Sequence, residues 1–309
     1  MRIRTIFFTF LIALACAVPV EVFAQQDDDV RGAFLTTRPK ASDKGEKTTG
    51  NAKPSRRRPK PAPDSPGPNN SKPKGGSTPA PGKATAQRLG LGLTLFRRDA
   101  NGLAVRTDPS HDFRKGDRVR VLLETNADGY LYIFNTTDDG KPVMIYPNPE
   151  VDEAGNYIQS HVPFEIPSSL AAEERLRWFS FDQNAGTEKL YFVFTREPLA
   201  TVPIEDDLIT FCRDNASSCP WHPATDVWAR IRKEAGEPVK IAQAGSLGTA
   251  QTSVEHRAAT RGIGLNRDDP EPSLIMLTAS TSRNMLVTTL ELSHKAVSLL
   301  LESNPEEPQ

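Results

Sequence analysis

The sequence predicts a mainly β fold, an antiparallel β-sandwich with one or two short accessory helices. Two observations support this prediction. Between residues 89 and 196, short runs rich in Val, Leu, Ile and aromatic residues alternate with clusters of Gly, Asp, Asn and Pro, the pattern of short strands joined by tight turns. The same stretch lacks the strand–helix–strand alternation of a parallel sheet. Consecutive strands are therefore expected to run in opposite directions.

The chain begins with the features of a secretory signal peptide over residues 1–24. Arg2 and Arg4 precede the apolar run "IFFTFLIALACAV", and "VFAQ" places small residues ahead of a cleavage site after Ala24. A membrane anchor is the weaker interpretation, because a span needs roughly 18–20 apolar residues. Another alternative is a lipoprotein leader ending at "ALAC", with Cys16 lipidated. We expect an exported protein (periplasmic, at the cell surface or secreted) that is not integral to a membrane.

A basic, Pro-rich segment over residues 36–86 is expected to be a disordered linker. It contains "KPSRRRPKPAPDSPGPNNSKPKGGSTPAPGK", in which apolar residues recur with neither a helical nor a strand period. Residues 36–88 contain 13 basic and 3 acidic residues, whereas residues 89–309 contain 22 basic and 32 acidic ones. The preceding residues 25–35 form a short N-terminal segment, and "RGAFLTTR" (31–38) is predicted to be a strand that pairs back onto the body.

The charge of the linker suggests an anionic partner. Arg56, Arg57, Arg58 and Lys60 form a dense basic cluster. They are candidates for binding an anionic envelope polymer or lipid, with an attraction of about 1 kcal/mol per charge near a surface. The same charges could instead fold back on the acidic body, or the segment could serve only as a solubilising spacer. A nucleic-acid partner is not expected for an exported protein.

Residues 87–203 contain the strands of the predicted sandwich. "DRVRVLLET" (117–125) alternates apolar with basic residues, as a half-buried strand does. "NADG" after it marks a hairpin turn, and the next strand, "YLYIFNT", is apolar on both faces, as expected at the centre of a sheet. The other strands predicted here are "LGLTLFRR" (89–98), "LAVR" (103–106), "KPVMIYP" (141–147), "RLRWFSFD" (175–182) and "KLYFVFTR" (189–196).

Aromatic residues at these strand positions raise the question of a binding platform. Trp178 and its neighbour Phe179 lie on opposite faces of their predicted strand. Aromatics on opposite faces cannot all line one groove, so most of them are expected to form the core. Tyr130, Tyr132 and Trp178 remain candidates for stacking on a sugar or peptide.

Residues 204–295 are expected to add a disulfide loop, a helix and further strands to the same body. Cys212 and Cys219 most simply form a disulfide in an oxidising compartment; a metal site, a redox pair or free thiols are the alternatives. "PATDVWARIRKEAG" (223–236) has the spacing of an amphipathic helix. The later predicted strands are "TRGIGL" (260–265), "PSLIMLTAS" (272–280) and "MLVTTLELSHK" (285–295), followed by a tail over residues 296–309.

Several strings resemble those of a bacterial domain family of unknown function, DUF4384. They are "FRKGDRVRVLLETNADGYLYIFN", "VMIYPNP", "VPFEIPSS" and "LYFVFTREPL", and the resemblance covers roughly residues 87–200. It implies a compact immunoglobulin-like module with an accessory role, since members are often exported or attached to signalling and protease-like domains. The family has no accepted catalytic residues, so the resemblance assigns none to this chain.

Motifs of an enzyme, a metal site or a cofactor site are not found in the sequence. Its histidines (His111, His161, His222, His256 and His294) show no H-x-x-x-H or H-E-x-x-H spacing, and no G-x-S-x-G elbow is present. No catalytic residue, metal or cofactor is therefore predicted. Three functions are considered, in this order: a non-catalytic exported module of the cell envelope that recognises a protein partner; electrostatic anchoring through the linker; and a hydrolase, which clustering of His161 or His111 with carboxylates in a cleft would favour.

Overall fold

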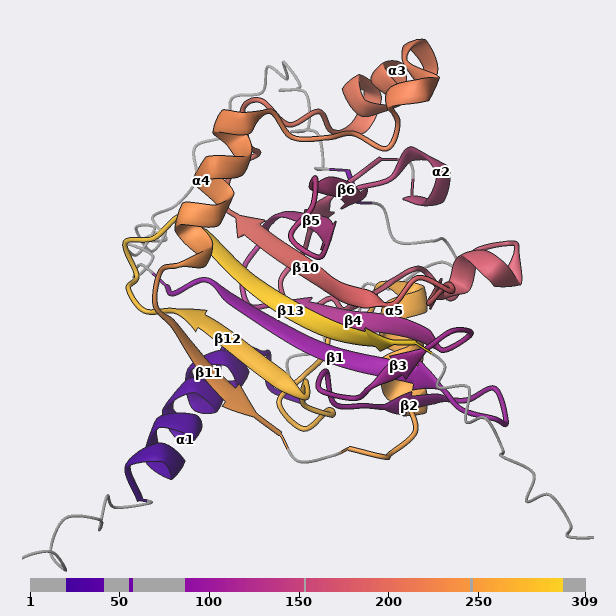
Figure 1. The fold of residues 1–309 in the computed structure, drawn as a ribbon. Coiled ribbons are helices and arrows are strands. Elements are labelled where there is room, and N and C mark those ends of the chain that lie inside the picture. The colour runs from indigo at the N-terminus through magenta and orange to yellow at the C-terminus, as the bar shows by residue number, and fades with distance from the viewer. Residues whose placement is uncertain (1–20, 42–55, 58–86, 153, 245–246, 297–309) are drawn as a thin grey trace, which may run out of the picture.

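Two β-sheets packed together form most of the protein (Figure 1). The computed structural model describes residues 21–41, 56–57, 87–152, 154–244 and 247–296. The predicted mainly β, sandwich-like architecture is confirmed. Most of the predicted signal peptide, most of the linker and nearly all of the predicted C-terminal tail lie outside the described residues.

The first sheet, sheet A, has the strand order β11-β12-β1-β4-β8, with β2 paired to β1 and β9 paired to β4. Each predicted strand from 89 to 125 is present with nearly the expected bounds. Only two residues of the predicted strand 175–182 are extended, because residues 174–177 form a 3₁₀ turn, η2 (Glu174–Arg177). The strands of sheet A are β1 (Gly90–Arg98), β2 (Ala104–Arg106), β4 (Arg118–Thr125), β8 (Phe164–Ile166), β9 (Phe179–Ser180), β11 (Val239–Gln243) and β12 (Leu274–Thr278).

The second sheet, sheet B, has the order β3-β13-β10-β5-β6, with β7 paired to β5. Every strand pair described in the two sheets is antiparallel except β3 with β13, which is parallel. The prediction of antiparallel pairing is therefore wrong at this one edge. The strands of sheet B are β3 (Phe113–Arg114), β5 (Gly129–Thr137), β6 (Val143–Tyr146), β7 (Tyr157–Ile158), β10 (Gly186–Thr195) and β13 (Met285–Lys295).

Strands from the last part of the chain complete both sheets. β12 lies between β11 and β1 in sheet A, and β13 lies between β3 and β10 in sheet B. The predicted strands 272–280 and 285–295 are thus confirmed, whereas the predicted strand 260–265 is wrong. Helix α5 (Ser253–Arg261) extends into that segment and ends at Gly262, whose φ of 64° suits glycine.

The structure contains more helices than the sequence predicts. Besides α5 they are α1 (Glu21–Leu35), α2 (Pro149–Asp152), α3 (Glu205–Asp214) and α4 (Thr225–Ala235), with a second 3₁₀ turn, η3 (Ala216–Ser218). The predicted helix 223–236 is confirmed as α4. The strand predicted over 31–38 is wrong, because most of this segment belongs to α1. Val30 and Phe34, one helical turn apart, pack against β11 and β12, so α1 does cover the body as the segment was expected to do (Figure 1).

Two apolar cores explain why the central strands are apolar on both faces. One fills the space between the sheets, and the other lies between sheet B and helices α3 and α4. The first contains Leu93, Leu95, Leu131, Ile133, Phe192 and Phe194, and the second contains Tyr132, Phe134, Tyr191, Val193, Leu208 and Ile231.

Candidate functional site

The three aromatic candidates are buried and form no exposed platform. Tyr130 and Tyr132 are 5% and 0% exposed and belong to the core beneath α3 and α4. Burial raises the pKa of Tyr132, and its hydroxyl accepts a hydrogen bond from the backbone N–H of Leu199 (3.0 Å). Trp178 is 8% exposed, with the guanidinium of Arg120 4.0 Å from its ring centroid. Tyr130 and Tyr132 therefore offer no stacking surface, because the core beneath the helices encloses their rings. Trp178 lines a groove that is described below.

Two of the four basic linker candidates contact the body itself. The carbonyl of Arg56 accepts a hydrogen bond from the Tyr157 N–H of β7 (2.8 Å). The Arg56 guanidinium lies 4.6 Å from the centroid of the Phe164 ring. Arg57 forms an ion pair with Asp206 at the start of α3 (2.9 Å). Arg58 and Lys60 lie outside the described residues, so the structure brings together only the first half of the predicted basic cluster.

A groove opens beside Arg56, between β6 of sheet B and β8 of sheet A. Its volume is about 230 Å³, and Phe164 of β8 and Phe179 of β9 lie in its wall together with Trp178. Arg56 and Arg175 carry positive charge there, and Glu150 and Glu165 carry negative charge. Its apolar wall is completed by Ile145, Ile166, Leu170 and Leu176. The groove thus offers aromatic side chains and the exposed carboxylate of Glu150 to a basic, extended segment; the Glu165 carboxylate is buried and lies 3.8 Å from Arg120.

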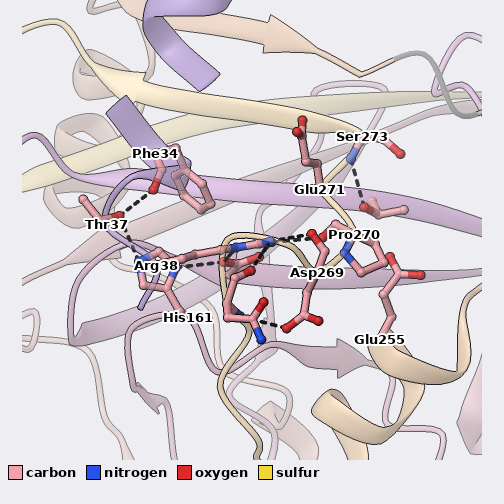
Figure 2. Close-up of polar contacts among 12 residues, drawn as sticks. Phe34, Thr37, Arg38, His161, Glu255, Asp269, Pro270, Glu271 and Ser273 are labelled. Atoms are coloured by element: carbon pink, nitrogen blue, oxygen red, sulfur yellow. Dashed lines mark hydrogen bonds and ion pairs between the residues drawn. The ribbon is translucent and has the colours of Figure 1, made fainter. Parts of the chain in front are cut away.

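A buried polar network lies on the outer face of sheet A (Figure 2). All five N–H groups of the Arg38 guanidinium are bonded. Two donate to the carboxylate of Glu124 on β4, at 2.8 and 2.6 Å. The other three donate to backbone carbonyl groups of the loop that precedes β12, those of Asn266, Asp269 and Pro270. Residues 36–41, which the sequence assigns to the linker, are therefore fixed to the body by an arginine that is 1% exposed.

His161 joins this network and creates a hydroxyl–imidazole–carboxylate chain. Its Nε2 lies 2.9 Å from the Thr37 hydroxyl, and its Nδ1 lies 2.8 Å from Glu124 Oε1. Burial alone would raise the pKa of Glu124, but hydrogen bonds from His161 and Arg38 outweigh it and lower that pKa. The backbone φ of His161 is 58°, a left-handed conformation that is uncommon for residues other than glycine.

The Thr37 hydroxyl is held at the end of α1. It donates its proton to the carbonyl of Phe34 (2.5 Å), while its oxygen lies 2.9 Å from His161 Nε2. Of five hollows over the described residues, none is lined by Thr37 or His161, and Glu124 lines a small one of about 10 Å³. The histidine–carboxylate contact that would favour a hydrolase is present between His161 and Glu124, and His161 lies outside these hollows.

Two further arginine–glutamate pairs occupy the same face of sheet A. Arg106 of β2 pairs with Glu255 of α5, and Arg120 of β4 lies 3.8 Å from Glu165 of β8, with every side chain at most 6% exposed. Sequence reasoning missed this network because charged residues that alternate along a strand suggest a solvent-facing side. The segments that cover this face lie far away in the sequence.

The two cysteines form the predicted disulfide. Cys212 of α3 and Cys219 are joined at an S–S distance of 2.07 Å, which confirms the structural alternative. Among the residues that the structure describes, no group of three His, Cys, Asp or Glu is placed to hold a metal ion. No helix within the described ranges is long and apolar enough to cross a membrane.

Comparison with known proteins identifies one part of the chain. Residues 112–198 match the model of the family described as "Domain of unknown function (DUF4384)". No curated protein and no solved structure matches the chain. The matched stretch runs from just before β3 to just after β10, whereas β1, β12 and β13 lie outside it and complete its sheets. The chain therefore contains a DUF4384 domain at residues 112–198.

Proposed function

We propose that the chain is a non-catalytic, exported binding module of the cell envelope that recognises an extended, basic segment of a protein partner. The groove between β6 and β8 is the site, and one observation carries the proposal: Arg56 already lies on its Phe164 wall. The predicted signal peptide supports export, and the two packed, mostly antiparallel sheets support an immunoglobulin-like sandwich.

The contacts of Arg56 support a mode of binding for such a segment. Its carbonyl group continues the hydrogen bonding of sheet B beyond β7 through Tyr157, the main-chain mode by which an extended peptide adds to a sheet edge. Its guanidinium lies on the face of Phe164, where an aromatic ring attracts a cation. The backbone contact supplies affinity for any extended chain, and the aromatic wall with the exposed carboxylate of Glu150 selects for arginine.

Electrostatic anchoring by the linker is the second candidate. It would use Arg56 and Arg57 on an outside surface, whereas both side chains contact the body. Anchoring would therefore first require these two contacts to break. The two proposals differ in their response to salt, because screening weakens exposed charge pairs far more than an arginine that lies on an aromatic ring beside main-chain hydrogen bonds.

A labelled peptide tests the proposal directly. The probe is a fluorescent peptide with the sequence of residues 53–60, KPSRRRPK, added to the full chain and to its Arg56→Ala, Arg57→Ala double variant. The chain's own segment competes in the parent protein at an effective concentration in the millimolar range. We expect the peptide to bind the double variant at least about tenfold more tightly, with binding that persists in 0.5 M salt, measured by fluorescence anisotropy.

Two controls separate the groove from general charge attraction. A peptide with glutamine in place of its arginines should lose binding, and adding Phe164→Leu to the double variant should weaken it. Leu103→Ala, at an exposed site on the β1–β2 turn, should leave binding unchanged. Equal binding to the parent and the double variant, or complete loss in salt with no effect of Phe164→Leu, would contradict the groove and favour electrostatic anchoring.

A further inference from the structure

The inward face of sheet B changes from apolar to polar at one end of the sandwich. Along β5, Leu131 and Ile133 face the core and are followed at the same spacing by Asn135 and Thr137. The neighbouring strands show the same change toward the same end of the sheet, staggered along the strands: β10 continues from Leu190, the partner of Asn135, to Glu188, and β13 continues from Leu292, the partner of Glu188, to His294. An alternating strand places every second residue inside, so these polar side chains stand where the core would otherwise continue.

A cavity of about 390 Å³ occupies this end of the sandwich. Asn135, Glu188 and His294 line it from sheet B, and Phe179 and Phe181 line it from the opposite side. Asp182, an exposed residue, lies at its mouth. Its size falls within the range of small-ligand sites in proteins. Because Phe179 also lines the groove of the proposed function, the two hollows are neighbours.

The cavity contains polar atoms that lack partners. His294 is 4% exposed, and no hydrogen bond joins its imidazole to any residue that the structure describes. The Asn135 Oδ1 atom is buried and likewise has no hydrogen-bond partner in the described chain, while its amide donates to Glu188 Oε2 (2.8 Å). Buried polar groups in proteins are nearly always bonded, so the buried Asn135 Oδ1 points to a ligand that supplies the missing contact, and the His294 imidazole lies beside it in the same wall.

The charges around the cavity identify the class of ligand. Glu188 and Asp182 contribute two carboxylates, and hydrogen bonds from Asn184 lower the pKa of Asp182. None of the described lining residues is Lys or Arg. Glu188, Asn135 Oδ1 and Asp182 all accept hydrogen bonds, and the ring of Phe181 can attract a cation. A ligand that donates hydrogen bonds and carries positive charge matches this set, and the apolar wall suits a short hydrocarbon stem.

We propose that this cavity binds a primary ammonium group on a short apolar stem, with Glu188 as its counter-ion and Asn135 Oδ1 and His294 as further acceptors. This site is separate from the groove at Phe164 and does not depend on the proposed partner.

The experiment uses n-butylammonium chloride as the probe and the full chain as the receptor. Uncharged 1-butanol and anionic butyrate are the matched probes of similar length. Binding is followed by the NMR shifts of the Glu188 and His294 backbone amides during titration. We expect saturable binding of butylammonium at least about tenfold tighter than that of butanol, and no binding of butyrate.

Matched variants locate the site. Glu188→Gln keeps the shape of the side chain but removes its charge. It should weaken the binding of butylammonium at least about tenfold. Glu291→Gln is the control. Glu291 pairs with Lys189 on the opposite face of sheet B, so this variant should leave the binding of butylammonium unchanged. Equal binding of butanol, the same loss in both variants, or no saturable shift in the parent protein would overturn the proposal. The peptide assay at the groove is unaffected by any of these outcomes.

Discussion

Replacing Arg38 by Met should lower the free energy of unfolding by about 3–5 kcal/mol, the usual cost of removing one partner of a buried ion pair. The estimate follows from the contacts of the guanidinium, whose five N–H groups all donate to protein oxygen atoms. The change leaves Glu124, 3% exposed, with only the hydrogen bond from His161, and it also leaves three backbone carbonyl groups without this donor. A domain of ordinary stability, about 5–15 kcal/mol, would lose a large share of it.

Urea unfolding followed by circular dichroism measures this loss, and the melting temperature should fall by roughly 6–20 °C for a chain of this size. Adding Glu124→Gln should restore part of the stability, because the buried charge is then removed together with its partner. Arg175→Met is the control. The ion pair between Arg175 and Glu173 is exposed, so this substitution should leave the unfolding midpoint unchanged. A loss for Arg38→Met no larger than that of the control would refute the reasoning.

The same network predicts a dependence on pH. The pKa of Glu124 is lower in the folded protein than its ordinary value, so the native state favours the carboxylate. The stability from this shift is fully present above the unfolded pKa, about 4.3, and is lost as the pH falls through the lower folded value. The difference between the parent and Arg38→Met should therefore be constant from pH 7 to about pH 5 and shrink at more acidic pH. A stability difference between the parent and Arg38→Met that grows as the pH falls would contradict this prediction.

Three further changes test other features of the fold by the same unfolding measurement. Gly129→Ala should cost about 1–3 kcal/mol, because the new Cβ would clash with the backbone oxygen of Thr195 and lie 2.7 Å from the Phe194 ring; a neutral effect would contradict the packing of β5 on β10. Gly32→Ala should add up to about 1 kcal/mol, since nothing lies within 4 Å of the new Cβ in α1; a loss would mean that the helix is not formed there. Cys212→Ser should cost about 2–3 kcal/mol, the value for so short a loop, and a reductant should then have no further effect.

The strands could be predicted from the sequence because alternation and turn residues are local signals. β13 has the predicted bounds, β1 and β4 each begin one residue later than predicted, and β5 is one residue longer at each end. The burial of both faces of β5 was also visible in its sequence. The helices that cover its outer face gave weaker signals, and only α4 was recognised.

The segments that failed depend on distant partners. Residues 36–41 have the composition of a linker, yet Arg38 is buried by the loop before β12 and by Glu124. The strand expected over 31–38 is helical because Val30 and Phe34 meet an apolar patch of β11 and β12, which no local pattern reveals. The segment 260–265 was misassigned because its Gly-Ile-Gly-Leu string resembles β1, whereas the capping box of Thr252 and Glu255 begins a helix just before it.

The candidate sites were predictable only in part. The linker arginines were singled out for their charge, but the groove that receives Arg56 comes from strands far from it in sequence. The sequence does contain a signal for the polar cavity: Asn135 and Thr137 extend the inward series of β5, and Glu188 and His294 extend the inward series of β10 and β13 toward the same end of the sheet. Inward-facing positions that change from apolar to polar at the same end of three neighbouring strands indicate a polar cavity at that end.

The position of β12 and β13 inside their sheets has a consequence for biosynthesis. Gly90 of β1 pairs with Leu277 of β12, so the contacts that close sheet A join residues nearly two hundred positions apart. Such long-range pairing slows folding. It also means that a ribosome must release almost the whole body before either sheet can be completed. Until then the nascent chain has bare strand edges, the state that chaperones protect. A nonsense mutation ahead of β13 would remove an interior strand from sheet B, so its product should be degraded rather than survive as a shortened domain.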